Sequence, residues 1–64
     1  MGYFPKYEGG GVSLVDALDD LGEDSSYEAR EYIAYANGIK DYTGTKQQNT
    51  YLLNKLKKGT LKRP

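Results

Sequence analysis

The acidic side chains in the first half of the sequence are the nearest approach to a catalytic or metal-binding set. Asp16, Asp19, Asp20 and Glu23 are close enough in sequence to gather around one turn. Such a cluster resembles the acid pair of a hydrolase or a loose calcium site. However, the ligand spacing of a calcium loop is absent, and no apolar wall is evident that would raise the pKa of one carboxyl. We therefore interpret these residues as a solvated acidic surface.

The composition excludes most nucleophilic and zinc chemistry. The chain has no histidine and no cysteine, so a hydroxyl nucleophile would have only a carboxylate or a lysine as its base. Zinc sites lose their commonest ligands, and disulfides are excluded. We therefore predict no catalytic residue, no bound metal and no cofactor, and we expect that the chain is not an enzyme by itself.

The aromatic residues favour binding over catalysis. Seven tyrosines and one phenylalanine are many for 64 residues, and a small helical core rich in leucine does not require them. Some rings must therefore face water. A tyrosine ring stacks on the apolar face of a sugar, and it stacks equally well on a nucleic-acid base. Composition alone does not choose between these two ligands.

The elements that would position these side chains are three capped helices. Each consists of a capping hydroxyl, a polar residue three places later, an apolar run and a closing glycine. The three sets are Ser13, Asp16 and Gly22; Ser25, Glu28 and Gly38; and Thr45, Gln48 and Gly59. In each set we expect the polar side chain to reach back to the cap, and Ile39 to pack beside its glycine. The pattern predicts helices over residues 14–21, 26–37 and 46–58.

The length allows one small core, and leucine stripes in the first and third helices commit one face of each to it. The predicted fold is all-α, a small three-helix bundle with an extended aromatic N-terminal segment. We divide the chain into an extended linker segment, residues 1–11, and a three-helix domain, residues 12–64. Aromatic residues in the first segment indicate that it lies across the bundle. No stretch is apolar enough to span a membrane, and no signal peptide is recognisable.

Charge is divided between the two halves of the chain. Residues 1–31 carry eight acidic and two basic side chains, a net charge of −6, whereas residues 32–64 carry seven basic and one acidic, a net charge of +6. One interpretation is that the acidic and basic surfaces are solvated and that their charges complement each other within the molecule. A basic C-terminal surface for an anionic polymer, either nucleic acid or a wall polymer, is the other.

Motifs along nearly the whole chain resemble a known bacterial and phage module. These are Ser13–Leu18, Asp24–Tyr27 with Arg30, Ile33–Ala34, Asn37–Ile39, Tyr42–Thr45, Gln48–Asn49, Leu52–Leu53 and Lys58–Gly59. Together they are similar to the small C-terminal cell-wall-binding domain of Gram-positive phage endolysins and of related amidase or muramidase autolysins. The segment around Tyr3–Tyr7 resembles the linker to the catalytic domain. The first half is more acidic here than that family leads one to expect.

This resemblance implies a non-catalytic module that anchors a covalently linked peptidoglycan hydrolase on the cell wall. The implied ligand is wall glycan or stem peptide. The implied location is the outer face of the bacterium, after synthesis in the host cytoplasm without a signal peptide. The candidate ligand-binding residues are Tyr42, Asn49, Gln47, Thr45, Gln48, Arg30 and Tyr27.

Several of these candidates have a structural alternative. Thr45 and Gln48 are explained as a capping box, and Arg30 is expected either to pair with a carboxylate of the first helix or to bind a stem-peptide carboxylate. Asn49 is harder to explain, because asparagine inside a helix is unfavourable and no cap requires it there. Gln47 and Asn49 offer donors and acceptors near Tyr42, where a sugar or a stem peptide would fit.

Two other functions compete with wall binding. A lysine-rich third helix gives the chain the outline of a helix-turn-helix. Its lysines crowd the C-terminal end, arginine occurs only twice and the net charge is zero, so the sequence does not favour nucleic acid. Self-association through the acidic and basic faces is the third interpretation, and a homo-oligomer would add avidity to wall binding.

Overall fold

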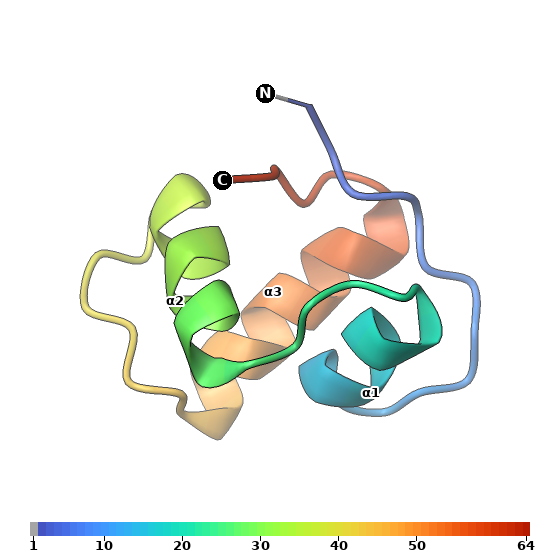
Figure 1. The fold of residues 1–64 in the computed structure, drawn as a ribbon, viewed down its shortest axis with the longest axis horizontal. Coiled ribbons are helices and arrows are strands. Elements are labelled where there is room, and N and C mark those ends of the chain that lie inside the picture. Colours follow the sequence, from blue (N-terminus) through green and yellow to red (C-terminus); the bar gives the residue numbers. More distant parts are fainter. Residues whose placement is uncertain (1) are drawn as a thin grey trace.

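Three helices make up the secondary structure of the computed structural model, which describes residues 2–64 (Figure 1). They are α1 (Leu14–Asp20), α2 (Tyr27–Ala36) and α3 (Lys46–Lys58). The predicted all-α class is confirmed, and the predicted ranges agree with these bounds to within one residue at each end. None of the helices in the described part is long and apolar enough to cross a membrane.

The helix starts follow the capping pattern with two corrections. Ser13 accepts from the Asp16 N–H, and Thr45 and Gln48 form a complete capping box at α3. The cap of α2 is Ser26 and not Ser25, because Ser26 accepts from the Ala29 N–H. The reciprocal side-chain bond predicted for α1 and α2 is also wrong. Asp16 in α1 and Glu28 in α2 instead contribute a negative charge to the first turn, which the helix dipole favours.

The helix ends rely on the left-handed backbone that glycine tolerates. Gly22, Gly38 and Gly59 have φ angles of 74°, 92° and 76° just beyond α1, α2 and α3. After α2, the Ile39 N–H donates to the Ala34 carbonyl at 2.9 Å, and the half-buried Ile39 side chain packs against the core. The prediction that Ile39 packs beside its glycine is thus confirmed.

The core is built from all three helices and from both terminal segments. Its buried side chains are Phe4, Tyr7, Leu14, Ala17, Leu18, Ile33, Ala34, Tyr42, Leu52, Leu53, Leu56 and Leu61. The N-terminal segment lies across the end of α3 (Figure 1), where the Tyr7 N–H donates to the Leu56 carbonyl. The aromatic segment therefore completes the core. The boundary between residues 11 and 12 stays a prediction.

A buried amide holds the C-terminal segment against α2. The Asn37 side chain donates to the Ile33 and Lys62 carbonyls and accepts from the Lys62 N–H. Lys62 also pairs with Tyr3 in an antiparallel bridge, so the two terminal segments run side by side. Lys62 is therefore held on one side by Asn37 at the end of α2 and on the other by Tyr3 of the N-terminal segment.

The hydroxyl of Tyr7 fixes the path of the glycine segment that leads into α1. It donates to Asp20 Oδ2 at 2.6 Å and accepts from the Gly11 N–H at 2.7 Å. A Cβ at Gly9 or Gly11 would lie within 2.7 Å of this hydroxyl, so the close approach requires glycine at both positions. The segment is therefore fixed by a side chain although its sequence is typical of a flexible hinge.

This arrangement predicts a pH-dependent contribution to stability. The hydrogen bond to Asp20, with burial and the nearby negative charge, raises the pKa of Tyr7 above its usual 10.0. A raised pKa in the folded state means that the stabilisation is fully present below pH 10 and is lost as the pH rises through the folded pKa. We expect Tyr7→Phe to destabilise the protein at pH 8 and to matter less at pH 11.5, measured by urea unfolding followed by circular dichroism. An equal difference between the two proteins at both pH values would contradict this account.

Candidate functional site

Four of the seven predicted site residues form one network between α2, the α2–α3 loop and α3. The Arg30 guanidinium donates from Nη1 to the Tyr42 hydroxyl at 2.9 Å, and this hydroxyl donates to Asn49 Oδ1 at 2.5 Å. The Tyr27 ring lies 5.5 Å from the Tyr42 ring and 5.6 Å from the Arg30 guanidinium carbon. The network explains the asparagine inside α3, because Asn49 is the acceptor that the Tyr42 hydroxyl requires.

Burial separates the members of this network. The Tyr42 side chain is only 4% exposed, whereas the Tyr27 side chain is 48% exposed. Arg30 is half-buried and also donates from Nε to the Ser25 carbonyl at 3.0 Å. It therefore pairs within the protein, as one interpretation of the sequence held, but with a hydroxyl and a carbonyl in place of an α1 carboxylate. Tyr27 alone presents a large exposed surface.

Thr45 and Gln48 are occupied by the capping of α3. Gln48 Oε1 accepts from the Thr43 and Thr45 N–H groups, and its Nε2 donates to the Asp41 carbonyl. The Thr45 hydroxyl accepts from the Gln48 N–H. These bonds fix the loop before α3 and so determine where the first turn of the helix presents its other side chains.

A hollow of about 350 Å³ lies between the end of α2 and the start of α3, and we call it the α2–α3 groove. It is lined by Asn37, Gly38, Ile39, Gln47, Gln48 and Tyr51. Gln47 and Tyr51 are exposed one turn apart on α3, and the Lys55 ammonium lies 5.5 Å from the centre of the Tyr51 ring. The groove thus combines the exposed ring of Tyr51, the exposed amide of Gln47 and the apolar side chain of Ile39.

Tyr51 was absent from the residues predicted for the site. Its spacing from Gln47 could have identified it, because residues four apart in a helix share a face and Tyr51 follows Gln47 by four. The structure brings these two residues together and places them on the other side of α3 from Asn49, which lines a different hollow.

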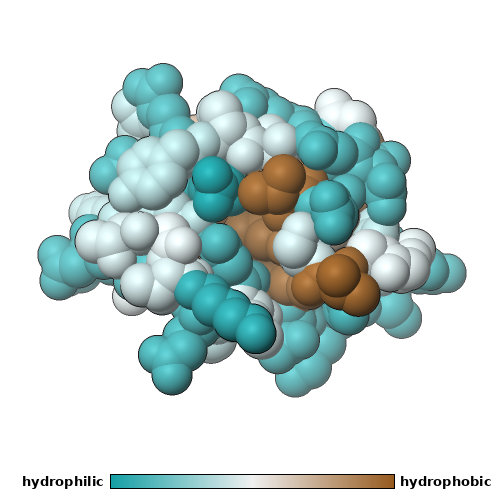
Figure 2. Space-filling model, turned by 90° about the horizontal axis from the view of Figure 1, so that it is seen from below, coloured by the Kyte–Doolittle hydropathy of each residue, from teal (hydrophilic) through white to brown (hydrophobic). Residues whose placement is uncertain are grey.

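This second hollow, the α1–α3 groove, also measures about 350 Å³. Its lining residues are Val12, Ser13, Leu14, Gly44, Lys46, Asn49, Thr50 and Leu53. Val12 is 86% exposed. The lower face of the molecule, where α1 lies in Figure 1, carries an apolar patch ringed by polar side chains (Figure 2). The start of α3 is therefore flanked by a groove on each side.

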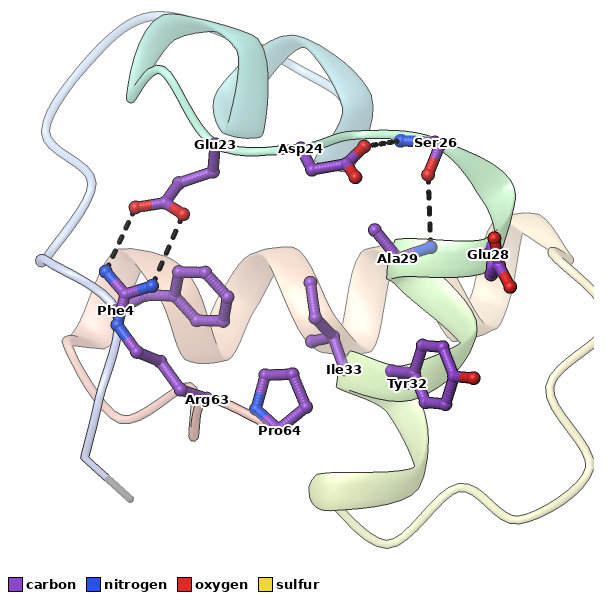
Figure 3. Close-up of a pocket in the computed structure, with 10 residues that line it drawn as sticks. All are labelled: Phe4, Glu23, Asp24, Ser26, Glu28, Ala29, Tyr32, Ile33, Arg63 and Pro64. Carbon is purple, nitrogen blue, oxygen red and sulfur yellow. Dashed lines mark hydrogen bonds and ion pairs between the residues drawn. The ribbon is translucent and has the colours of Figure 1, made fainter.

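A third hollow, the α2–C-terminal groove, lies between α2, the loop before it and the chain end, with a volume of about 320 Å³. Figure 3 shows its ten lining residues, which are Phe4, Glu23, Asp24, Ser26, Glu28, Ala29, Tyr32, Ile33, Arg63 and Pro64. Arg63 donates to both oxygens of Glu23, at 3.3 and 3.0 Å, and its guanidinium carbon lies 4.4 Å from the centre of the Phe4 ring. Asp24, Ser26 and Ile33 belong to the motifs that carry the family resemblance, but none of the ten residues is among the predicted ligand-binding residues.

The acidic residues of the first half do not gather around one point. Asp19 accepts from the Ser25 hydroxyl, Asp20 from Tyr7, and Glu23 from Arg63. Within residues 2–64, no group of three or more potential ligands from His, Cys, Asp and Glu is placed to hold a metal ion. Each of these three carboxylates has a hydrogen-bond partner within the protein, and the side chains of Asp16, Asp19 and Asp20 are exposed.

Two curated phage proteins are similar to this chain. It is 45% identical over 51 residues to the endolysin of Listeria phage A511, a match that covers 80% of the chain and 15% of the endolysin. It is 48% identical over 48 residues to the L-alanyl-D-glutamate peptidase of Listeria phage A118, covering 75% of the chain and 17% of the peptidase. The chain is therefore related to a short part of Listeria phage endolysins, and it spans less than a fifth of their length.

Neither family models nor solved structures add to this finding. No family model matches the chain, and no solved structure matches it.

Proposed function

We propose that this chain is a non-catalytic module that binds the peptidoglycan of Gram-positive cell walls and anchors a linked peptidoglycan hydrolase there. The observation that carries the proposal is the match to a short part of two phage lytic proteins by a chain without histidine or cysteine. The segment shared with these proteins is too short for a second core, so a catalytic unit would occupy the rest of their length.

The chemistry of the α2–α3 groove supports a sugar-containing ligand. An exposed aromatic ring covers the apolar face of a pyranose, while a neighbouring amide both donates to and accepts from its hydroxyl groups. Tyr51 and Gln47 supply these two parts on one rigid helix. The apolar Ile39 at the same groove suits the methyl group of an N-acetyl substituent.

The remaining predicted residues have supporting roles in this proposal. Arg30, Tyr42 and Asn49 position the loop before α3, Thr45 and Gln48 fix its first turn, and Tyr27 offers a second exposed ring beside this network. Because Tyr42 is buried, its contribution to binding passes through the residues that it positions. We further propose that the module works at the outer face of the bacterium, where its polymer lies.

A pelleting assay tests the proposed function. The chain fused to a fluorescent protein is mixed with purified Listeria cell walls and centrifuged, with the fluorescent protein alone as the control. We expect most of the fusion, and little of the control, in the pellet. A fusion left in the supernatant at every wall concentration would contradict the proposal.

A further inference from the structure

The α2–C-terminal groove combines an apolar floor with a negatively charged rim. Phe4 and Ile33 are 5% and 3% exposed, and with Ala29 and Pro64 they form the apolar part of the lining. Figure 3 shows these side chains around the open centre of the groove. An aliphatic chain would exclude water from this floor, whereas a hydroxylated sugar would leave its polar groups without partners there.

The single basic group of the groove is already neutralised. Arg63 makes a bidentate salt bridge with Glu23 and also lies over the Phe4 ring, so its guanidinium has two partners. This leaves Asp24 and Glu28 as the carboxylates that determine the charge at the rim. An anionic ligand is disfavoured there and a cationic one is favoured.

Local structure keeps one of these charges in place. The backbone N–H of Ser26 donates to Asp24 Oδ1 at 2.9 Å, and this bond together with the Ser26 hydroxyl lowers the pKa of Asp24 below its usual 3.8. Asp24 is therefore ionised at any physiological pH. The exposed Tyr32 ring also lines the groove, and an aromatic ring attracts a cation that lies over its face.

We propose that the α2–C-terminal groove binds a primary ammonium group carried on an aliphatic chain, which is the chemistry of a diamino acid side chain in a peptidoglycan stem peptide. The assignment to a stem peptide rests on the proposed function, whereas the preference for an alkylammonium group rests on the groove alone. The site is separate from the α2–α3 groove, so it would give the module a second contact with the wall and add avidity.

The test is a titration of the ¹⁵N-labelled chain with Nα-acetyl-lysine amide, followed by NMR. We expect saturable shifts of the backbone amides of Ser26, Ala29 and Ile33. The same compound acetylated on its side-chain nitrogen should cause no saturable shift, because it has lost the ammonium charge. Equal shifts with both compounds, or none with either, would overturn the proposal.

Two double variants with the same change in net charge sharpen the result. Asp24→Asn/Glu28→Gln keeps the acceptor for Ser26 but removes the charge at the rim, and we expect the dissociation constant for Nα-acetyl-lysine amide to rise at least about fivefold. Asp16→Asn/Glu31→Gln removes two charges outside the groove. It should change the dissociation constant for Nα-acetyl-lysine amide less than about twofold, as expected for screened charges. Equal weakening in both variants would show a long-range charge effect and overturn the site.

Wall pelleting of the same variants separates this inference from the proposed function. Weaker pelleting of the groove variant alone supports a stem-peptide ammonium as the ligand, and unchanged pelleting would overturn that assignment. If the native chain binds the lysine probe but does not pellet with walls, the ammonium site is supported and the proposed function is contradicted.

Discussion

Replacing Leu52 by alanine is expected to bring the protein to the edge of unfolding at 25 °C. Leu52 is 0% exposed in α3, at the centre of the core. Truncation of a buried leucine to alanine costs about 2–5 kcal/mol, through lost burial and the cavity left behind. A domain of this length has a total stability of roughly 3–10 kcal/mol. Urea unfolding followed by circular dichroism at 222 nm measures the loss.

Val12→Ala is the matched control for this prediction. Val12 is also an aliphatic side chain, but it is 86% exposed, so its truncation should change the stability by less than about 0.5 kcal/mol. If Leu52→Ala were no more destabilising than Val12→Ala, the core described above would be wrong.

Gln47→Ala/Tyr51→Ala is expected to weaken wall binding at least about fivefold. Loss of one stacked ring and one amide hydrogen bond removes roughly 1–3 kcal/mol, and about 1.4 kcal/mol corresponds to a tenfold change in affinity. Both residues are exposed on α3, and alanine is a good helix former, so the fold should persist. The measurement is the dissociation constant from pelleting at increasing wall concentration, with circular dichroism to verify the helix content.

A control variant removes the same kinds of side chain elsewhere. Tyr35→Ala/Asn54→Ala deletes an exposed tyrosine and an exposed amide that line none of the three grooves. We expect its affinity for walls to stay within about twofold of the native value, as for surface substitutions outside a binding site. Equal losses in the two variants would mean that the α2–α3 groove is not the binding surface.

Helix positions were predictable because the signals that define them are local. A cap and a closing glycine lie within the helix or beside it, so sequence spacing was enough to place α1, α2 and α3. The error at the start of α2 had a local cause as well. Two serines follow Asp24, and the choice of Ser26 as the cap depends on Asp24 accepting from the Ser26 N–H and on Arg30 binding the Ser25 carbonyl.

The environment of each tyrosine was less predictable, because it depends on tertiary contacts. Tyr42 lies in a loop and is buried, since Arg30 and Asn49 meet at its hydroxyl. Tyr51 lies in a helix and is exposed. Sequence alone indicated that some rings face water but not which ones. The same limit applies to Tyr7, whose hydroxyl fixes a glycine segment that looks flexible as a sequence.

Sequence reasoning pointed to the start of α3 as the ligand site, and binding there stays a prediction. The start of α3 was identified from Gln47 and Asn49, and the structure places a groove on each side of it. The assignment of Tyr42 as a ligand contact assumed an exposed ring, and its burial changes the proposed role to one of positioning. Contacts between residues far apart in sequence decide this, and no local pattern encodes them.

The most direct test of the central claim measures binding and cutting in one sample. The chain is incubated with purified Listeria walls, and both the fraction of chain in the pellet and the newly released amino groups and reducing sugars in the supernatant are determined. Binding without any release above that of walls alone is the predicted result. Release of wall fragments by the chain, or a chain that remains in solution, would contradict the account.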